Sequence, residues 1–168
     1  MIEMTAKEII ENEKNKFVKS PLAKTVEKME INENNTNKYD KPIVNEVKEA
    51  IKNKMDGLAR EKEVAEELKS KYPPEKGYQI VSEAYLRDKD GNIVKDTVTG
   101  EARRVDFIVV KNGKVVDSIE VTSKTANKTE QSAKEERIRD NGGNYIRDNN
   151  GNLVEIPSTV HTRIERRD

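Results

Sequence analysis

Two acidic residues within apolar segments are the first side chains that could do chemistry. Asp106 is the only charged residue of the segment VDFIVV, and Glu120 stands between Ile119 and Val121 in VVDSIEVTS. Burying a carboxylate among apolar side chains is costly unless the carboxylate is paired or binds a cation. The two residues therefore predict either a cation site or a set of ion pairs.

A third carboxylate, Glu61, comes from a segment with helical periodicity. In GLAREKEVAEELKSKY the apolar residues share one helix face, and Glu61 falls in the middle of that arc. Such a Glu either pairs with Arg103 or Arg104, lies at the rim of the apolar face, or binds a metal ion shared with Asp106 and Glu120. Three oxygen ligands without His or Cys suit Mg²⁺ best, with Mn²⁺ or Zn²⁺ as alternatives.

The turn between the two strands decides whether Asp106 and Glu120 face the same side. A two-residue loop of Asn112 and Gly113 turns Glu120 to the face opposite Asp106. A three-residue loop that also includes Lys111 sets Asp106 diagonal to Glu120, so that both carboxylates point to one side. The residues fit both loops, and the register stays open at this point.

The composition excludes several kinds of site. Among 168 residues there is no Cys and no Trp, and His161 is the only His. A disulfide framework, a thiolate zinc site, a cysteine nucleophile and a two-histidine mechanism are therefore excluded. Lys and Arg together number 32, as do Asp and Glu, so the formal net charge is zero and does not indicate a polyanionic partner. We expect no membrane span, because no run of 18 apolar residues occurs.

The elements that position these residues follow an α/β (α+β) order. Residues 1–56 are predicted as a helical entry or linker segment, with helix-like stretches at 5–19 and 43–55, and residues 57–168 as the main domain. The main domain is predicted to begin with a helix from Gly57 that ends before Pro73 and Pro74, followed by a strand after Gly77. A long hairpin-like excursion over 87–103 and two strands around the turn KNGK come next. A helix at 126–140, a short strand pair, and a basic turn or helix at 158–167 complete the predicted order.

This order of residues resembles the PD-(D/E)xK nuclease superfamily. The segments GLAREKEVAEELKSKY, EARRVDFIVV, IEVTSKTANKTEQSAKEERIRDNGGNYIRD and the closing TRIERR resemble nuclease toxin domains of contact-dependent growth inhibition and related polymorphic toxins. The resemblance covers about residues 57–168. It implies a restriction-endonuclease-like core, a mixed β-sheet flanked by helices, and a helical N-terminal appendage.

The resemblance also implies roles for individual residues. Glu61, Asp106 and Glu120 would hold the metal, which would make a nucleophile of a bound water. Thr122 occupies the position of the lysine in the Glu-x-Lys pattern, so Lys124 or Lys134 would replace that lysine, and we favour Lys134. Gln131 lies one helical turn before Lys134 and would share its face. These are the predicted catalytic residues: Glu61, Asp106, Glu120, Thr122, Lys124, Gln131 and Lys134.

The resemblance implies that the protein is a toxin that hydrolyses DNA, or alternatively tRNA, in the cytoplasm of a competing bacterial cell. A larger secreted or cell-surface protein would deliver it, and a cognate immunity protein would block it. The excursion over 87–103 would then be a substrate clamp or a contact for the immunity protein. Residues predicted to contact the nucleic acid are Arg103, Arg104, Arg137, Arg163, Arg166 and Arg167.

Two other classes of function stay open on the sequence alone. In a non-catalytic binding module, Glu61 and Asp106 would merely be paired with Arg103 or Arg104. In a metal-independent ribonuclease, Lys134, Thr122 and His161 would act without an ion. The clustering of three acids without an assigned buried cation favours the metal-dependent nuclease.

Overall fold

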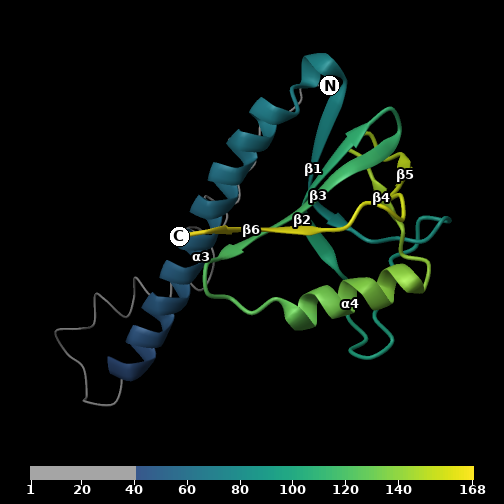
Figure 1. The fold of residues 1–168 in the computed structure, drawn as a ribbon. Helices are drawn as coiled ribbons and strands as arrows, with labels where there is room; N and C mark the ends of the chain where they lie inside the picture. Colours follow the sequence, from purple (N-terminus) through teal and green to yellow (C-terminus); the bar gives the residue numbers. More distant parts are fainter. Residues whose placement is uncertain (1–40) are drawn as a thin grey trace. The chain divides into compact units, whose positions relative to one another are not determined.

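The computed structural model describes residues 41–168, so the predicted helix at 5–19 lies outside the described residues. The chain divides into two units, with the boundary between Glu63 and Val64. Helix α3 (Lys41–Lys71) contributes to both and ends two residues before Pro73, as the proline pair predicts (Figure 1). The separate helices expected at 43–55 and from Gly57 are wrong. A single Gly costs a long helix only about 1 kcal/mol, so the helix continues through it.

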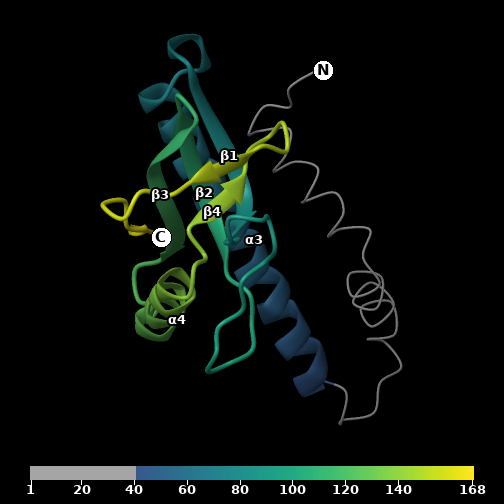
Figure 2. The same cartoon turned by 90° about the vertical axis from the view of Figure 1, so that its right-hand side faces the viewer.

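Residues 78–167 form a six-stranded mixed sheet with a helix inserted between its strands (Figures 1 and 2). The strand order is β1-β2-β3-β5-β4, and β6 pairs with β3 beside that path. This is the α+β architecture that the sequence predicts. The elements are η2 (Pro74–Lys76), β1 (Tyr78–Tyr85), β2 (Arg104–Lys111), β3 (Lys114–Ser123), α4 (Thr129–Asp140), β4 (Tyr145–Arg147), β5 (Leu153–Glu155) and β6 (Arg163–Arg167).

The basic C-terminal segment forms a strand, so the turn or helix predicted at 158–167 is wrong there. Strand β6 runs parallel to β3, with Ile119 opposite Arg163 and Ser123 opposite Arg167. Its five residues contain one apolar side chain, Ile164, which is too little for the usual period-2 signal of a strand. Backbone pairing to β3 and ion pairs between its side chains and neighbouring elements hold it in place.

A β-bulge sets the register of β2 and β3. Asn112 and Gly113 form a two-residue turn, with φ of 53° and 74°, so Lys111 pairs with Lys114. Beyond the turn the register shifts by one residue, because Val116 has no partner on β2. Neither of the two expected registers is therefore correct along the whole hairpin.

The main core lies between the sheet and α4. Ile138 of α4 is fully buried against residues of β1, β2 and β4. Just beyond α4, Gly143 approaches Ile138 so closely that an added Cβ would lie 2.5 Å from its Cγ2. Asp96, in the excursion over 87–103, is buried and accepts two hydrogen bonds from Arg137 at 2.8 and 2.9 Å, which ties the excursion to α4. None of the helices in the described part is long and apolar enough to cross a membrane.

Candidate active site

The bulge brings Asp106 and Glu120 to the same face of the sheet. Phe107 pairs with Ile119, and the next step of this register sets Asp106 directly opposite Glu120. The two carboxylates thus share one side, as the three-residue loop predicted, although a bulge and not the loop produces the arrangement. Asp106 Oδ2 also accepts a hydrogen bond of 2.8 Å from the backbone N–H of Val121.

The environment of Asp106 disfavours its negative charge. Burial raises its pKa, and the nearby charge of Glu120 raises it further, to about 6. The hydrogen bond from Val121 and the positive charge of Arg103 act in the opposite direction but do not compensate. A buried carboxylate that faces a partly buried one is an arrangement that a divalent cation stabilises.

Three donors surround the buried carboxylate of Glu120. Arg103 Nη2 lies 2.9 Å from its Oε2, and both side chains are buried. Gln131 Nε2 and Lys128 Nζ contact its Oε1 at 3.1 and 3.4 Å. Arg103 Nε is a buried donor without a hydrogen-bond partner within residues 41–168. Glu120 therefore connects β3 to the segment before β2 and to the start of α4.

The lysine at this cluster is Lys128, which the sequence analysis did not select for catalysis. Lys134 Nζ lies 2.7 Å from Glu101 Oε2, and Lys124 Nζ lies 2.7 Å from Asp168 Oδ2. Neither of these lysines contacts the acid pair through its ammonium group. Lys128 lies three residues before Gln131, one helical turn earlier, and this i, i+3 spacing is the signal that could have found it.

Thr122 and Glu61 are the two remaining predicted catalytic residues, and only Thr122 lies on the same strand as the acid pair's Glu120. Thr122 follows Glu120 by two residues on β3, is buried, and so shares its face. Glu61 is half-buried on α3, in the first unit, and its metal role stays a prediction. Within residues 41–168 there is no group of three or more Asp, Glu or His side chains arranged to hold a metal ion.

Most arginines predicted to contact nucleic acid are engaged in other contacts. Arg103 flanks the acid pair, while Arg104 pairs with Glu83 at 3.6 Å and lies over the ring of Tyr85. Arg137 binds Asp96 and lowers the pKa of that carboxyl well below its usual range. The predicted catalytic His161 of the metal-independent alternative is exposed, outside this cluster.

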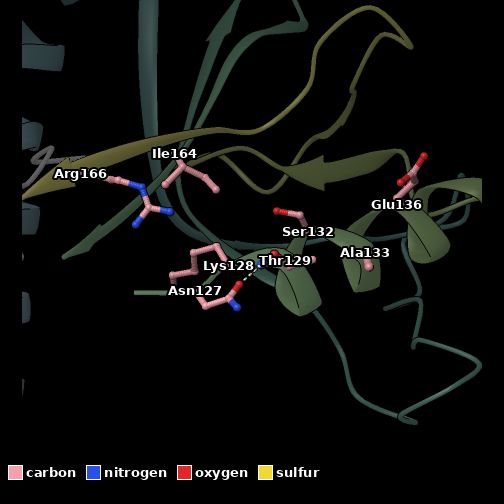
Figure 3. A pocket seen from close by; sticks show the side chains of 8 residues that line it. All are labelled: Asn127, Lys128, Thr129, Ser132, Ala133, Glu136, Ile164 and Arg166. Atoms are coloured by element: carbon pink, nitrogen blue, oxygen red, sulfur yellow. Dashed lines mark hydrogen bonds between the residues drawn. The ribbon is translucent and has the colours of Figure 1, made fainter. Parts of the chain in front are cut away.

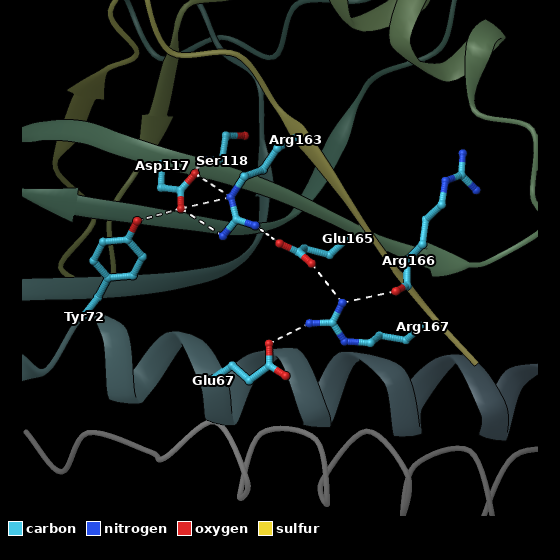
Figure 4. A network of polar contacts seen from close by, with 8 residues as sticks. All are labelled: Glu67, Tyr72, Asp117, Ser118, Arg163, Glu165, Arg166 and Arg167. Atoms are coloured by element: carbon cyan, nitrogen blue, oxygen red, sulfur yellow. Dashed lines mark hydrogen bonds and ion pairs between the residues drawn. The ribbon is translucent and has the colours of Figure 1, made fainter.

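A polar network occupies the opposite face of the sheet (Figure 4). Arg163 donates to both carboxylate oxygens of Asp117, and Tyr72 donates its hydroxyl to the same carboxylate at 2.8 Å. Burial alone would raise the pKa of Asp117, but these hydrogen bonds outweigh it and the pKa is lowered. Arg167 binds Glu67 at the end of α3. This network is structural, because it joins β3, β6 and α3 through satisfied ion pairs.

A cleft of about 490 Å³ lies between β6 and the start of α4 (Figure 3). Ile164 and Arg166 line it from β6. The other side is lined by Asn127, Lys128, Thr129, Ser132, Ala133 and Glu136. Lys128 belongs both to this cleft and to the donors around Glu120. The cleft therefore adjoins the acid pair.

A strained backbone position lies beside Asp106 on β1. Ser82 pairs with Phe107 and Ala84 with Val105, which leaves Glu83 level with Asp106. Glu83 has a φ of 53°, in the left-handed region that residues other than Gly rarely adopt. Strained backbone positions cluster at functional sites, where the surrounding structure holds them in place. The sequence around Glu83 contains no signal that predicts this conformation.

Comparison with known proteins adds no family to this picture. No family model, no curated protein and no solved structure matches the chain.

Proposed function

We propose that the chain is a metal-dependent nuclease in which Asp106 and Glu120 hold a divalent cation. The observation that carries this proposal is the pair of facing, largely buried carboxylates, with Lys128 and Gln131 beside one of them. Burial and the neighbouring charge of Glu120 raise the pKa of Asp106, and a bound cation would offset this cost of placing two carboxylates side by side.

The donor set fits Mg²⁺ better than a softer metal. Mg²⁺ is commonly held by one or two carboxylates, several waters and the phosphate oxygens of a substrate. A carboxylate oxygen has two lone pairs, so the hydrogen bond from Val121 to Asp106 Oδ2 leaves acceptor capacity on that side chain. When bound, such a cation supplies an activated water and stabilises negative charge on a phosphodiester.

The protein's own side chains would act on the substrate around this pair. Lys128 can turn its ammonium group from Glu120 to a phosphate oxygen, because its Nζ lies 3.4 Å from that carboxylate and its side chain is partly exposed. Gln131 donates to Glu120 and so fixes the orientation of the carboxylate. Arg103 holds the Glu120 carboxylate in place through a buried ion pair of 2.9 Å.

The wider context follows from the resemblance to PD-(D/E)xK nuclease toxins. The element order of a helix, three antiparallel strands and a second helix supports a restriction-endonuclease-like core. In this proposal the substrate is DNA, with tRNA as the alternative, and the site of action is the cytoplasm of a competing cell. A larger secreted protein would deliver the domain, and a cognate immunity protein would neutralise it.

One observation favours a second candidate function, a non-catalytic binding module. Arg103, Lys128 and Gln131 together satisfy both oxygens of Glu120 without any metal. In that case Glu120 is the centre of a buried ion-pair network that fixes α4 on the sheet. The two candidates differ in whether divalent cations and Asp106 matter for cleavage.

Cleavage assays with two substrates separate the candidates. Purified protein is incubated with supercoiled plasmid DNA and, separately, with total tRNA, each with Mg²⁺, Mn²⁺, Zn²⁺ or EDTA. The variants are Asp106→Ala and, as a matched control, Asp90→Ala, which removes an exposed carboxylate from a turn. We expect metal-dependent cleavage by the wild type and by Asp90→Ala, and its loss in Asp106→Ala. Absence of cleavage with every metal would favour the binding module.

A further inference from the structure

We propose that the cleft between β6 and α4 binds one unpaired nucleotide of the substrate, next to the phosphodiester at the acid pair. This inference rests on the proposed nuclease function. It adds that the substrate presents a single-stranded or flipped-out nucleotide, with its phosphate between Lys128 and Arg166. The shared chemistry is that of a nucleotide in either DNA or RNA.

The register of the sheet places the cleft beside the acid pair. Ile164 pairs with Glu120 across β3 and β6, and Arg166 pairs with Thr122. Side chains at paired positions of neighbouring strands lie on the same face, about 5 Å apart. Asp106, Glu120 and Ile164 thus form one row across three strands. Ile164 lines the cleft, so the cleft lies next to Glu120 on this face of the sheet.

The charges of the cleft suit a phosphate at one end. Arg166 Nη1 donates to the backbone carbonyls of Ser123, Lys124 and Ala126 at 3.1, 3.4 and 2.8 Å, so its guanidinium is held in place without neutralisation. Among the described residues no carboxylate pairs with it. Glu136, the acidic residue of the lining, lies at the other end of the cleft (Figure 3), which directs a phosphate towards Arg166.

The size and the walls of the cleft suit a single nucleotide. Its volume of about 490 Å³ falls within the roughly 300–1,000 Å³ of small-ligand sites. Ala133 and Ile164 offer apolar surface to a base or sugar, while Asn127 and Ser132 offer hydrogen bonds. Bases in a duplex present only their edges to a protein, so a base enters such a cleft only when it is unpaired or flipped out.

Binding without cleavage tests this directly. In EDTA, the fluorescence anisotropy of a fluorescein-labelled single-stranded 12-mer of mixed sequence is compared with that of its duplex, in DNA and RNA versions. The full chain is used, as wild type and with Arg166→Gln or Ala133→Leu. Lys114→Gln is the matched control, because it removes an exposed positive charge at the opposite end of β3. Ser132→Gln narrows the same cleft and replaces Ala133→Leu if the circular dichroism of that variant changes.

We expect the wild type to bind the single strands more tightly than the duplexes. Arg166→Gln should weaken single-strand binding about tenfold and reduce the slope of log K against log salt by about 0.7, the value for one lost phosphate contact. Ala133→Leu should weaken binding with an unchanged salt slope, because it fills space and removes no charge. Lys114→Gln should leave binding within about twofold of the wild type, since its charge lies outside the cleft.

Two results would overturn the inference while leaving the nuclease proposal in place. One is equal affinity for duplex and single strand, and the other is wild-type binding by both Arg166→Gln and the cleft-filling variant, in each case with cleavage that still requires Asp106. A wild type that neither binds nor cleaves any of these nucleic acids would overturn the nuclease proposal and this inference together.

Discussion

Asp106→Asn is expected to stabilise the folded protein at neutral pH while it removes a metal ligand. The pKa of Asp106 rises from its ordinary 3.8 to about 6 on folding. At about 1.4 kcal/mol for each unit of pKa, holding this carboxylate ionised costs the folded state roughly 3 kcal/mol above pH 6. Asn keeps an oxygen for the N–H of Val121 and offers an N–H to Glu120, so the substitution removes the charge without losing the hydrogen bond.

The pH dependence of this effect has a definite sign. Because the pKa in the folded state is the higher one, the folded state binds more protons, and the contribution of Asp106 to stability falls as pH rises from about 4 to 6. At pH 4 the variant and the wild type should differ little. At pH 7.5 the free energy of unfolding of Asp106→Asn should exceed that of the wild type by up to about 3 kcal/mol.

Urea unfolding followed by circular dichroism at both pH values, in EDTA, measures this difference. Asp117→Asn is the matched control and should behave in the opposite way. The pKa of Asp117 is lowered in the folded state, so its charge stabilises at neutral pH and that gain is lost as pH falls. If Asp106→Asn were less stable than the wild type at pH 7.5, with a deficit independent of pH, the account of the acid pair would be refuted.

Three further predictions concern the lysines, the excursion and the end of α4. Lys128→Met should lower the initial rate of cleavage about 100-fold, because Lys128 contacts Glu120 at the site. Lys134→Met should change that rate less than about threefold, because Lys134 binds Glu101 outside the site. Asp96→Asn should speed proteolysis within 87–103, since it weakens the bonds that hold the excursion to α4. Gly143→Ala should lower the free energy of unfolding by about 1–3 kcal/mol in urea titrations, because its Cβ would meet Ile138.

Much of the fold follows from local signals in the sequence. The apolar runs of β2 and β3, the turn of Asn112 and Gly113, and the stop at Pro73 each have a local physical cause, and the structure contains all of them. The C-terminal strand β6 has no such cause, because its single apolar residue gives no alternation and its place depends on pairing with β3. Local patterns cannot predict a strand whose stability is supplied by a distant partner.

The candidate site was only partly predictable, for a related reason. Asp106 and Glu120 stand out as charges in apolar strands, but their common face depends on the bulge at Val116, which nothing in the sequence marks. Lys128 was missed because it lies at the very start of α4, where its i, i+3 spacing to Gln131 could have indicated a shared face but not the contact of both residues with Glu120. Sequence patterns identify the charged side chains that are costly to bury. The strand register and the contacts between distant residues determine which partners offset that cost.

The most direct test of the central claim is a Mn²⁺ titration followed by electron paramagnetic resonance, which detects the free aquo ion and needs no substrate. The account predicts that the wild type and Asp90→Ala remove Mn²⁺ from solution at one ion per chain, with competition by Mg²⁺, and that Asp106→Asn and Glu120→Gln do not. A wild type that removes no Mn²⁺, or an Asp106→Asn variant that removes as much as the wild type, would contradict a metal site at the Asp106 and Glu120 pair.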